Sequence, residues 1–191
     1  MATSQEIFRA WLRDNMAPAL RECGFQGSGQ DYHRRYDSNW AAINFQRDRY
    51  SSAAQLRFTI NLGTASAAVL AADRRPVDSP VPEVQCHWRQ RIGVLIPGRR
   101  DTWWAIHEDE RPRELESLTA EVVPGLVERA VPHLEKMATD EAILDSSLAS
   151  WPLDKLPPAF QDICGPILHK VGPPQRFAEY MRVLDATEPD L

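Results

Sequence analysis

Residues 55–62 read Gln-Leu-Arg-Phe-Thr-Ile-Asn-Leu and carry the clearest pattern in the chain. Leu56, Phe58, Ile60 and Leu62 alternate with polar residues, and successive side chains of a strand point to opposite faces of a sheet. The segment therefore predicts a strand with one buried face and one polar face, which is typical of antiparallel sheets.

The flanking segments share this two-residue period. We expect further strands at residues 31–36, 40–47, 83–94 and 101–107. Residues 37–39 and 97–100 carry turn-forming residues, and residues 26–30 are rich enough in glycine to predict a loop. In the fourth strand the period places Cys86, Trp88 and Ile92 on one face. These segments together predict an antiparallel meander of four to five strands.

Helical spacing replaces the strand period at both ends of the chain. Apolar residues at positions 7, 11, 12, 16 and 20 predict an N-terminal helix, capped by Thr3 or Ser4 and ended by Gly24. We expect Pro18 to kink or shorten this helix.

Several helices are predicted after the sheet as well. A helical stripe starts near residue 113, and we expect Pro124 and Pro132 to divide it. Shorter helices are predicted at residues 141–148, 158–170 and 174–184, whereas residues 63–83, between the third and fourth strands, are ambiguous and could include a short helix at 66–73. The expected fold is α+β, with the N-terminal helix and the C-terminal helices packed mainly on one face of the sheet.

Composition limits the class of protein. The chain has 191 residues, of which 43% are hydrophobic, and a net charge of −5, which argues against disorder and against a generally basic binder. Three widely spaced cysteines and the lack of a signal peptide or apolar span predict a cytoplasmic protein that does not bind membranes. We expect one α+β domain over residues 1–145 and a helical extension over residues 146–191, packed on the same domain.

The net charge hides two opposite halves. Residues 30–100 hold eleven arginines against six acidic residues, a net charge of +5, whereas the rest of the chain holds eleven basic and 21 acidic residues, a net charge of −10. The positive charge of the sheet region is therefore carried by guanidinium groups, which pair well with carboxylates and phosphates.

Several short motifs occur in an order that resembles a known family. They are Gly24-Phe25, Ile43-Asn44-Phe45-Gln46, Phe58-Thr59-Ile60-Asn61-Leu62-Gly63, Cys86-His87, Arg91-Ile92-Gly93 and Trp103-Trp104. In this order they resemble the bacterial family called domain of unknown function 4304, over roughly residues 5–145. After Gln46 this chain has Arg47-Asp48, where relatives carry a basic and then a small hydroxyl residue. The resemblance implies no established activity.

The strand phases predict one polar surface. If the apolar positions face the core, the opposite face carries amides, guanidiniums and one imidazole from three strands: Asn44, Gln46, Arg57, Thr59, Asn61, His87, Arg89 and Arg91. Such a face is rich in hydrogen-bond donors and favours an anionic ligand or an acidic partner. The alternative is a solvated sheet face with ordinary cross-strand pairs.

Other candidate sites are weaker. His87 could serve as a general base, but no partner stands at the spacing of a catalytic triad, and a hydrogen-bonded structural histidine is favoured. Cys86 is expected to be a core residue, and the acidic run after His107 is better explained by a helix N-terminus than by a metal. We therefore expect no metal and no cofactor.

Three functions are compatible with the sequence. The first is a non-catalytic, immunity-like binding protein that holds a protein partner or an anionic small molecule on the polar face. The second is a small enzyme that acts on a phosphorylated or nucleotide-like substrate, with His87 as acid or base and the arginines as an anion clamp. The third, binding of nucleic acid, is disfavoured by the acidic remainder of the chain. The oligomeric state is left open.

Overall fold

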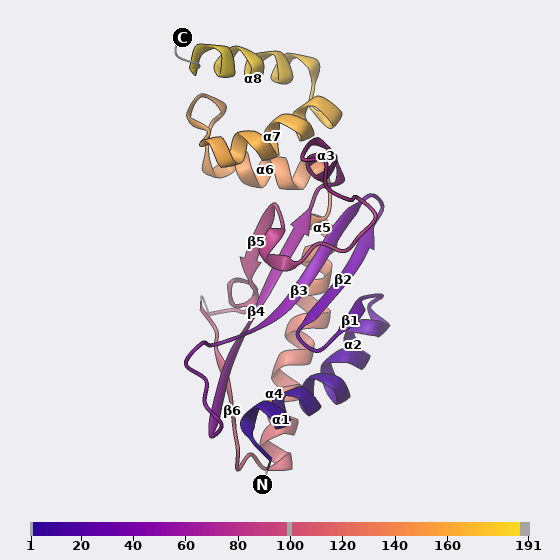
Figure 1. The fold of residues 1–191 in the computed structure, drawn as a ribbon, viewed down its shortest axis with the longest axis vertical. Coiled ribbons are helices and arrows are strands. Elements are labelled where there is room, and N and C mark those ends of the chain that lie inside the picture. The colour runs from indigo at the N-terminus through magenta and orange to yellow at the C-terminus, as the bar shows by residue number, and fades with distance from the viewer. Residues whose placement is uncertain (1, 99–100, 188–191) are drawn as a thin grey trace.

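Strand β4 (Gln55–Ala65) is the centre of a six-stranded antiparallel sheet (Figure 1). A computed structural model of the protein describes residues 2–98 and 101–187. The other strands are β1 (Gln26–Ser28), β2 (Asp31–Tyr36), β3 (Asn39–Arg47), β5 (Trp88–Arg91) and β6 (Trp104–His107). β4 pairs with β3 along one edge, and on the other edge its first part pairs with β6 and its last part with β5. The predicted α+β class with an antiparallel sheet is confirmed.

Two details of the sheet differ from the sequence prediction. Residues 26–28 form an extra strand, because positive φ angles at Gly27 and Gly29 let the chain fold back on β2. The strand predicted over residues 83–94 is reduced to β5, since 3₁₀ turns at Glu83–Gln85 and Ile92–Leu95 replace both ends. In the turn predicted at residues 97–100, Arg99 and Arg100 lie outside the described residues.

The N-terminal helix forms as predicted, but Pro18 does not shorten it. Thr3 caps α1 (Ser4–Trp11) with a capping box, and Gly24, with a φ of +80°, follows the end of α2 (Ala17–Glu22). Between the two helices, Leu12–Met16 is a π-helical turn, in which the N–H of Ala17 donates to the carbonyl of Leu12. This wider turn accommodates Pro18, so the helix continues without a break.

A π-helical segment also occurs in the long helix after the sheet. α4 (Pro112–Pro124) continues through a π-helical segment, Gly125–Ala130, into α5 (Val131–Met137). The N–H of Val131 donates to the carbonyl of Leu126, directly before Pro132. The predicted division at the two prolines is therefore wrong: the helix widens at these points and does not end.

The main core lies between the sheet and these helices. Leu56, Phe58, Ile60 and Leu62 are fully buried there, as their alternation predicted, together with Phe45 of β3. Further members of this cluster come from α1, α2, α4 and α5, so those helices cover one face of the sheet (Figure 1). We call it the helix face and the opposite one the open face.

The upper end of the open face is covered by α3 (Ala67–Ala72) and the segment that follows it. Trp40, Ala42 and Ala65 pack there against Leu70, Val81 and Cys86. Cys86 is buried, as predicted, but the prediction that it shares a face with Ile92 is wrong. The chain reaches β5 only at Trp88, after the 3₁₀ turn, so the strand period does not extend back to Cys86.

Three helices are stacked beyond this end of the sheet (Figure 1). They are α6 (Asp140–Ser150), α7 (Pro158–Val171) and α8 (Pro174–Thr187), and they share a hydrophobic cluster that includes Val69 of α3. None of the helices within residues 2–98 and 101–187 is long and apolar enough to cross a lipid bilayer.

Candidate functional site

Seven of the eight predicted site residues project from the open face. Asn44 and Gln46 lie on β3, Arg57, Thr59 and Asn61 on β4, and Arg89 and Arg91 on β5. Asn44 pairs in register with Asn61, Gln46 with Thr59, and Asn61 with Arg91. Because residues in register on neighbouring strands share a face, the alternation in the sequence brought these side chains together as expected.

The register also reveals a row that the sequence did not show. One residue from each of five strands stands beside the next across the sheet: Ser28, Asp31, Asn44, Asn61 and Arg91. We call these five residues the transverse row. It runs at right angles to the strands, with a carboxylate toward one end, amides in the middle and a guanidinium at the other end.

Hydrogen bonds fix the amides of this face. The side-chain amide of Asn44 donates to the carboxylate of Asp31 (2.7 Å), and that of Asn61 donates to the Oε1 atom of Gln46 (2.7 Å). Gln30, before β2, donates to the carbonyl of Phe45 (2.6 Å). These amides are therefore oriented before any ligand arrives, which lowers the entropy cost of binding.

Each arginine of the face has an acidic partner. Arg89 forms a bidentate salt bridge with Glu83, with N–O distances of 2.8 and 3.1 Å. Arg91 pairs with Asp101, and Arg57 lies 3.5 Å from Asp48. Asp48 lies in the loop after β3, and Glu83 and Asp101 lie in a 3₁₀ turn and a bend, although strands were predicted over residues 83–94 and 101–107. The face is thus less one-sided in charge than the eight predicted residues alone.

The ion pairs differ in their exposure to water. The Glu83 side chain is only 5% exposed, so Arg89 neutralises a carboxylate that burial would otherwise destabilise. Arg91 and Asp101 are both well exposed, at 40% and 57%. The hydrogen bond from Arg91 lowers the pKa of Asp101, but water screens an exposed pair of this kind, so it is weak. Arg91 is therefore the cation that can exchange its partner.

Trp103 separates two of the arginines. The guanidinium carbons of Arg57 and Arg91 lie 5.5 and 5.3 Å from the centre of its ring. Its neighbour Trp104 points to the helix face and stacks on Phe58 at 5.6 Å. The two tryptophans thus point to opposite sides, as adjacent residues of a strand must.

Thr59 is not available to a ligand. Its hydroxyl donates to the carbonyl of Thr102 (2.8 Å), and the residue is fully buried. The segment that leads into β6 covers it. Thr59 therefore fixes this segment on the sheet.

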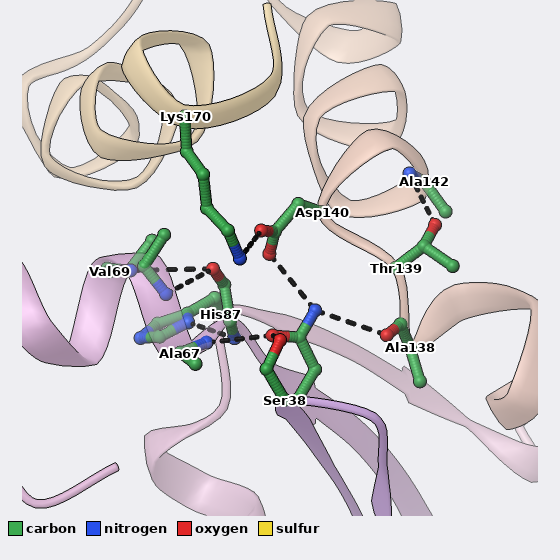
Figure 2. Close-up of polar contacts among 12 residues, drawn as sticks. Ser38, Ala67, Val69, His87, Ala138, Thr139, Asp140, Ala142 and Lys170 are labelled. Carbon is green, nitrogen blue, oxygen red and sulfur yellow. Dashed lines mark hydrogen bonds and ion pairs between the residues drawn. The ribbon is translucent and has the colours of Figure 1, made fainter.

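His87 is not brought to the other seven residues. Its backbone N–H donates to the carbonyl of Thr64, and its ring Nδ1 accepts from the N–H of Ser66 (2.9 Å). The ring thus belongs to a cluster of polar contacts where the sheet meets α3 and the C-terminal helices (Figure 2). The Nε2 atom is buried without a hydrogen-bond partner among the described residues.

Asn39 and Asp140 connect the parts of this cluster. The Asn39 amide donates to Asp140 (3.0 Å) and to the carbonyl of Ala138 (3.1 Å), and its oxygen accepts from the N–H of Ala67 (2.9 Å). Lys170 of α7 completes the cluster by donating to Asp140 at 2.8 Å. The start of β3 is thereby joined to α3, α6 and α7 (Figure 2).

The pKa values in this cluster indicate a structural role. Burial lowers the pKa of His87 to about 4, and Arg75 adds to this effect. Burial alone would raise the pKa of Asp140, but hydrogen bonds from Lys170, Ser66 and Asn39 outweigh it, and the net pKa is lowered. The ring is therefore neutral and the carboxylate charged at neutral pH, and no carboxylate among the described residues hydrogen-bonds to His87.

The remaining candidate residues are Cys86 and the acidic run after His107. Burial raises the pKa of Cys86 to about 12, so its thiol is protonated and unreactive at neutral pH. His107, Glu108, Asp109 and Glu110 do not converge, and no group of three metal-ligating side chains occurs within residues 2–98 and 101–187.

Three hollows follow the transverse row. One of about 230 Å³ lies over Asn61, Arg89 and Arg91, and one of about 500 Å³ lies over Asn44 and the loop after β3. A third, of about 300 Å³, extends from Asp31 to the segment at Pro80–Glu83. The first two share Gln46, and the first and third share Glu83. We call these three neighbouring hollows together the transverse groove.

Comparison with known proteins places the chain in a family. No curated protein and no solved structure matches it. A family model described as domain of unknown function (DUF4304) matches residues 16–136, from the end of the π-helical turn before α2 through the whole sheet to α5. Because this match covers more than half of the 191 residues, the chain belongs to the DUF4304 family.

Proposed function

We propose that the protein is a non-catalytic binding protein that holds an anionic group in the transverse groove. The group belongs to an acidic protein partner or to an anionic small molecule. The observation that carries this proposal is the position of Arg91, whose guanidinium lines a hollow beside the oriented amides of Asn61 and Gln46. A guanidinium next to fixed amide groups is well suited to bind a carboxylate or a phosphate.

Exchange of partners makes such binding feasible. A ligand carboxylate would replace Asp101 on Arg91, and Asp101 is exposed enough to be hydrated once it is released. The same exchange on Arg89 would leave the buried Glu83 carboxylate without its counter-charge. Arg91 is therefore the binding residue, and Arg89 maintains the wall of the groove.

The two other functions are less well supported by the geometry. For an enzyme, His87 would need an accessible ring beside the arginines, but its Nε2 atom is buried and its Nδ1 atom is occupied by Ser66. For a nucleic-acid binder, the carboxylates of Asp48, Glu83 and Asp101 stand against the arginines that would contact phosphates.

An NMR titration with two anionic probes tests the proposal. Inorganic phosphate and an acetylated penta-glutamate peptide are added to the full chain, and the side-chain amide signals of Asn61 and Gln46 are followed. We expect both probes to shift these signals and Arg91→Ala to weaken binding about fivefold, the value of roughly one exposed ion pair. Arg13→Ala is the matched control, because Arg13 is also exposed and paired with an exposed aspartate, Asp14.

Two results would overturn the proposal. One is the absence of any shift with either probe. The other is an affinity that stays the same in Arg91→Ala while the backbone spectrum shows an intact fold. Binding should also weaken as salt is added, because ions screen exposed charges.

A further inference from the structure

We propose that the transverse groove binds an extended peptide segment of a protein partner, laid across the strands, with an acidic side chain on Arg91 and a basic side chain on Asp31. This inference rests on the proposed function and names the ligand class and its polarity. It starts from the order of charges in the transverse row, where Asp31 and Arg91 stand on either side of two asparagines.

The floor of the groove offers the same groups as a peptide bond. The Asp31 carboxylate can only accept, so Asn44 must use its nitrogen toward it, which leaves the Asn44 oxygen for another molecule. The bond from Asn61 to Gln46 leaves the Asn61 oxygen and the Gln46 nitrogen unused among the described residues. Fixed amide donors and acceptors of this kind match the alternating N–H and C=O groups of a peptide main chain.

The walls fit an elongated ligand. On one side the groove is bounded by Pro80, Val81 and Glu83, and on the other by the loop that carries Asp48 and Arg49. Neighbouring hollows share Gln46 or Glu83 as lining residues, and together the three hollows lie over β2 to β5.

The length of the row fits a defined spacing. Three strand intervals separate Asp31 from Arg91, and at about 4.8 Å each they span about 14 Å. Four residues of an extended chain, at about 3.3–3.6 Å each, cover about 13–14 Å. In an extended chain, side chains four positions apart point to the same side. An acidic and a basic residue four positions apart would therefore both reach the row.

Charge argues for this ligand over a simple anion. A small anion would use only Arg91, and the carboxylate of Asp31 would repel a second negative charge at the other end of the groove. Asp31 and Arg91 form a pair of opposite charges too far apart to neutralise each other directly. A segment that carries one charge of each sign satisfies both.

A titration with designed peptides tests the inference. The probe is acetyl-Gly-Glu-Ser-Thr-Ser-Lys-Gly-amide, and it is compared with a version in which Glu replaces Lys and with one in which Glu and Lys stand three positions apart. We expect the full chain to bind the probe about fivefold more tightly than either comparison peptide, which corresponds to one exposed ion pair. The side-chain amide signals of Asn44, Asn61 and Gln46 report binding.

A charge reversal provides the decisive variant. Asp31→Arg should reverse the preference, so that the peptide with two Glu residues binds about fivefold more tightly than the probe. Asp14→Arg, an exposed aspartate on the N-terminal helix, is the matched control and should leave the preference unchanged.

The two proposals fail in different ways. Equal binding of all three peptides by the unmodified chain, or an unchanged preference in Asp31→Arg, overturns the peptide inference. If Arg91→Ala still weakens every peptide in that case, the proposed function stands. If Arg91→Ala weakens none of them, the proposed function falls as well.

Discussion

At His87, a ring nitrogen accepts a hydrogen bond from the backbone of Ser66, and burial keeps the ring uncharged. A histidine in this position makes folding sensitive to pH. The pKa is about 4 in the folded protein and close to 6.5, the ordinary value, in an unfolded chain. As the pH falls below about 6.5, the unfolded chain takes up a proton that the folded protein refuses.

The free energy of unfolding should therefore fall between pH 6.5 and pH 4, and the contribution of His87 should level off below pH 4. We expect the loss to be up to about 3 kcal/mol. Urea unfolding at a series of pH values measures it. His33 and His133 also have lowered pKa values, so the test is a comparison with His87→Asn, whose side-chain oxygen can still accept from Ser66. Equal slopes in the two proteins would contradict the prediction.

For individual site residues, the sequence predicted which face of the sheet each side chain lies on but not the ion pairs that it makes. Alternation placed Asn44, Asn61 and Arg91 on one side correctly, because the period of a strand fixes the direction of each side chain. It did not identify Glu83 and Asp101 as partners of the arginines: both residues begin predicted strands, and the structure replaces those strand ends with a 3₁₀ turn and a bend. Neutralisation of the arginines was therefore visible only in the structure.

Among the elements, β4 depends on one glycine for its close contact with the segment that covers the open face. A Cβ atom on Gly63 would lie 2.7 Å from the Cβ of Cys86 and 2.9 Å from its sulfur. Gly125, in the long helix, is different: an added Cβ would meet nothing closer than 4.0 Å. The two glycines form a natural pair for comparison.

We expect Gly63→Ala to lower the free energy of unfolding by about 1–3 kcal/mol, because the covering segment must move away from β4. Gly125→Ala should leave it unchanged or raise it by up to about 1 kcal/mol, because alanine favours the helix. Denaturant unfolding of both variants measures the difference. A Gly63→Ala protein as stable as the unmodified chain would show that the contact is not needed.

The elements that prediction missed share a physical cause. The sequence places Pro18 and Pro132 inside helical stripes, and the simplest rule ends a helix before such a residue. In the structure, one π-helical turn widens the helix just before each proline and keeps the apolar stripe on the core. Burial of that stripe outweighs the irregular backbone, and local rules do not contain this tertiary contribution.

For the molecule as a whole, we propose that the two parts of the chain on either side of the predicted boundary near residue 145 differ in stability. The sheet and its helices share a large hydrophobic cluster, whereas α6, α7 and α8 share a smaller one with Val69 of α3. Their polar connection to the sheet is the cluster around Asn39 and Asp140.

The rates of amide hydrogen exchange should differ between these two parts of the chain. We expect the amides of α7 and α8 to exchange at least about tenfold faster than those of β3 and β4, because a smaller core opens with a lower free energy. Mass spectrometry of the exchanged full chain measures this, and Asp140→Ala should widen the gap by loosening the connection. Uniform protection across the chain would show instead that it unfolds as one unit.

The change of partner along one edge of β4 has a consequence for synthesis on the ribosome. β5, which pairs with the last part of β4, leaves the ribosome before β6, which pairs with its first part. Until residues 104–107 have emerged, the backbone groups at Gln55–Phe58 have no neighbour on that side. A nascent chain that stops short of Trp104 therefore carries an open sheet edge, the kind of surface that chaperones shield and that aggregation exploits.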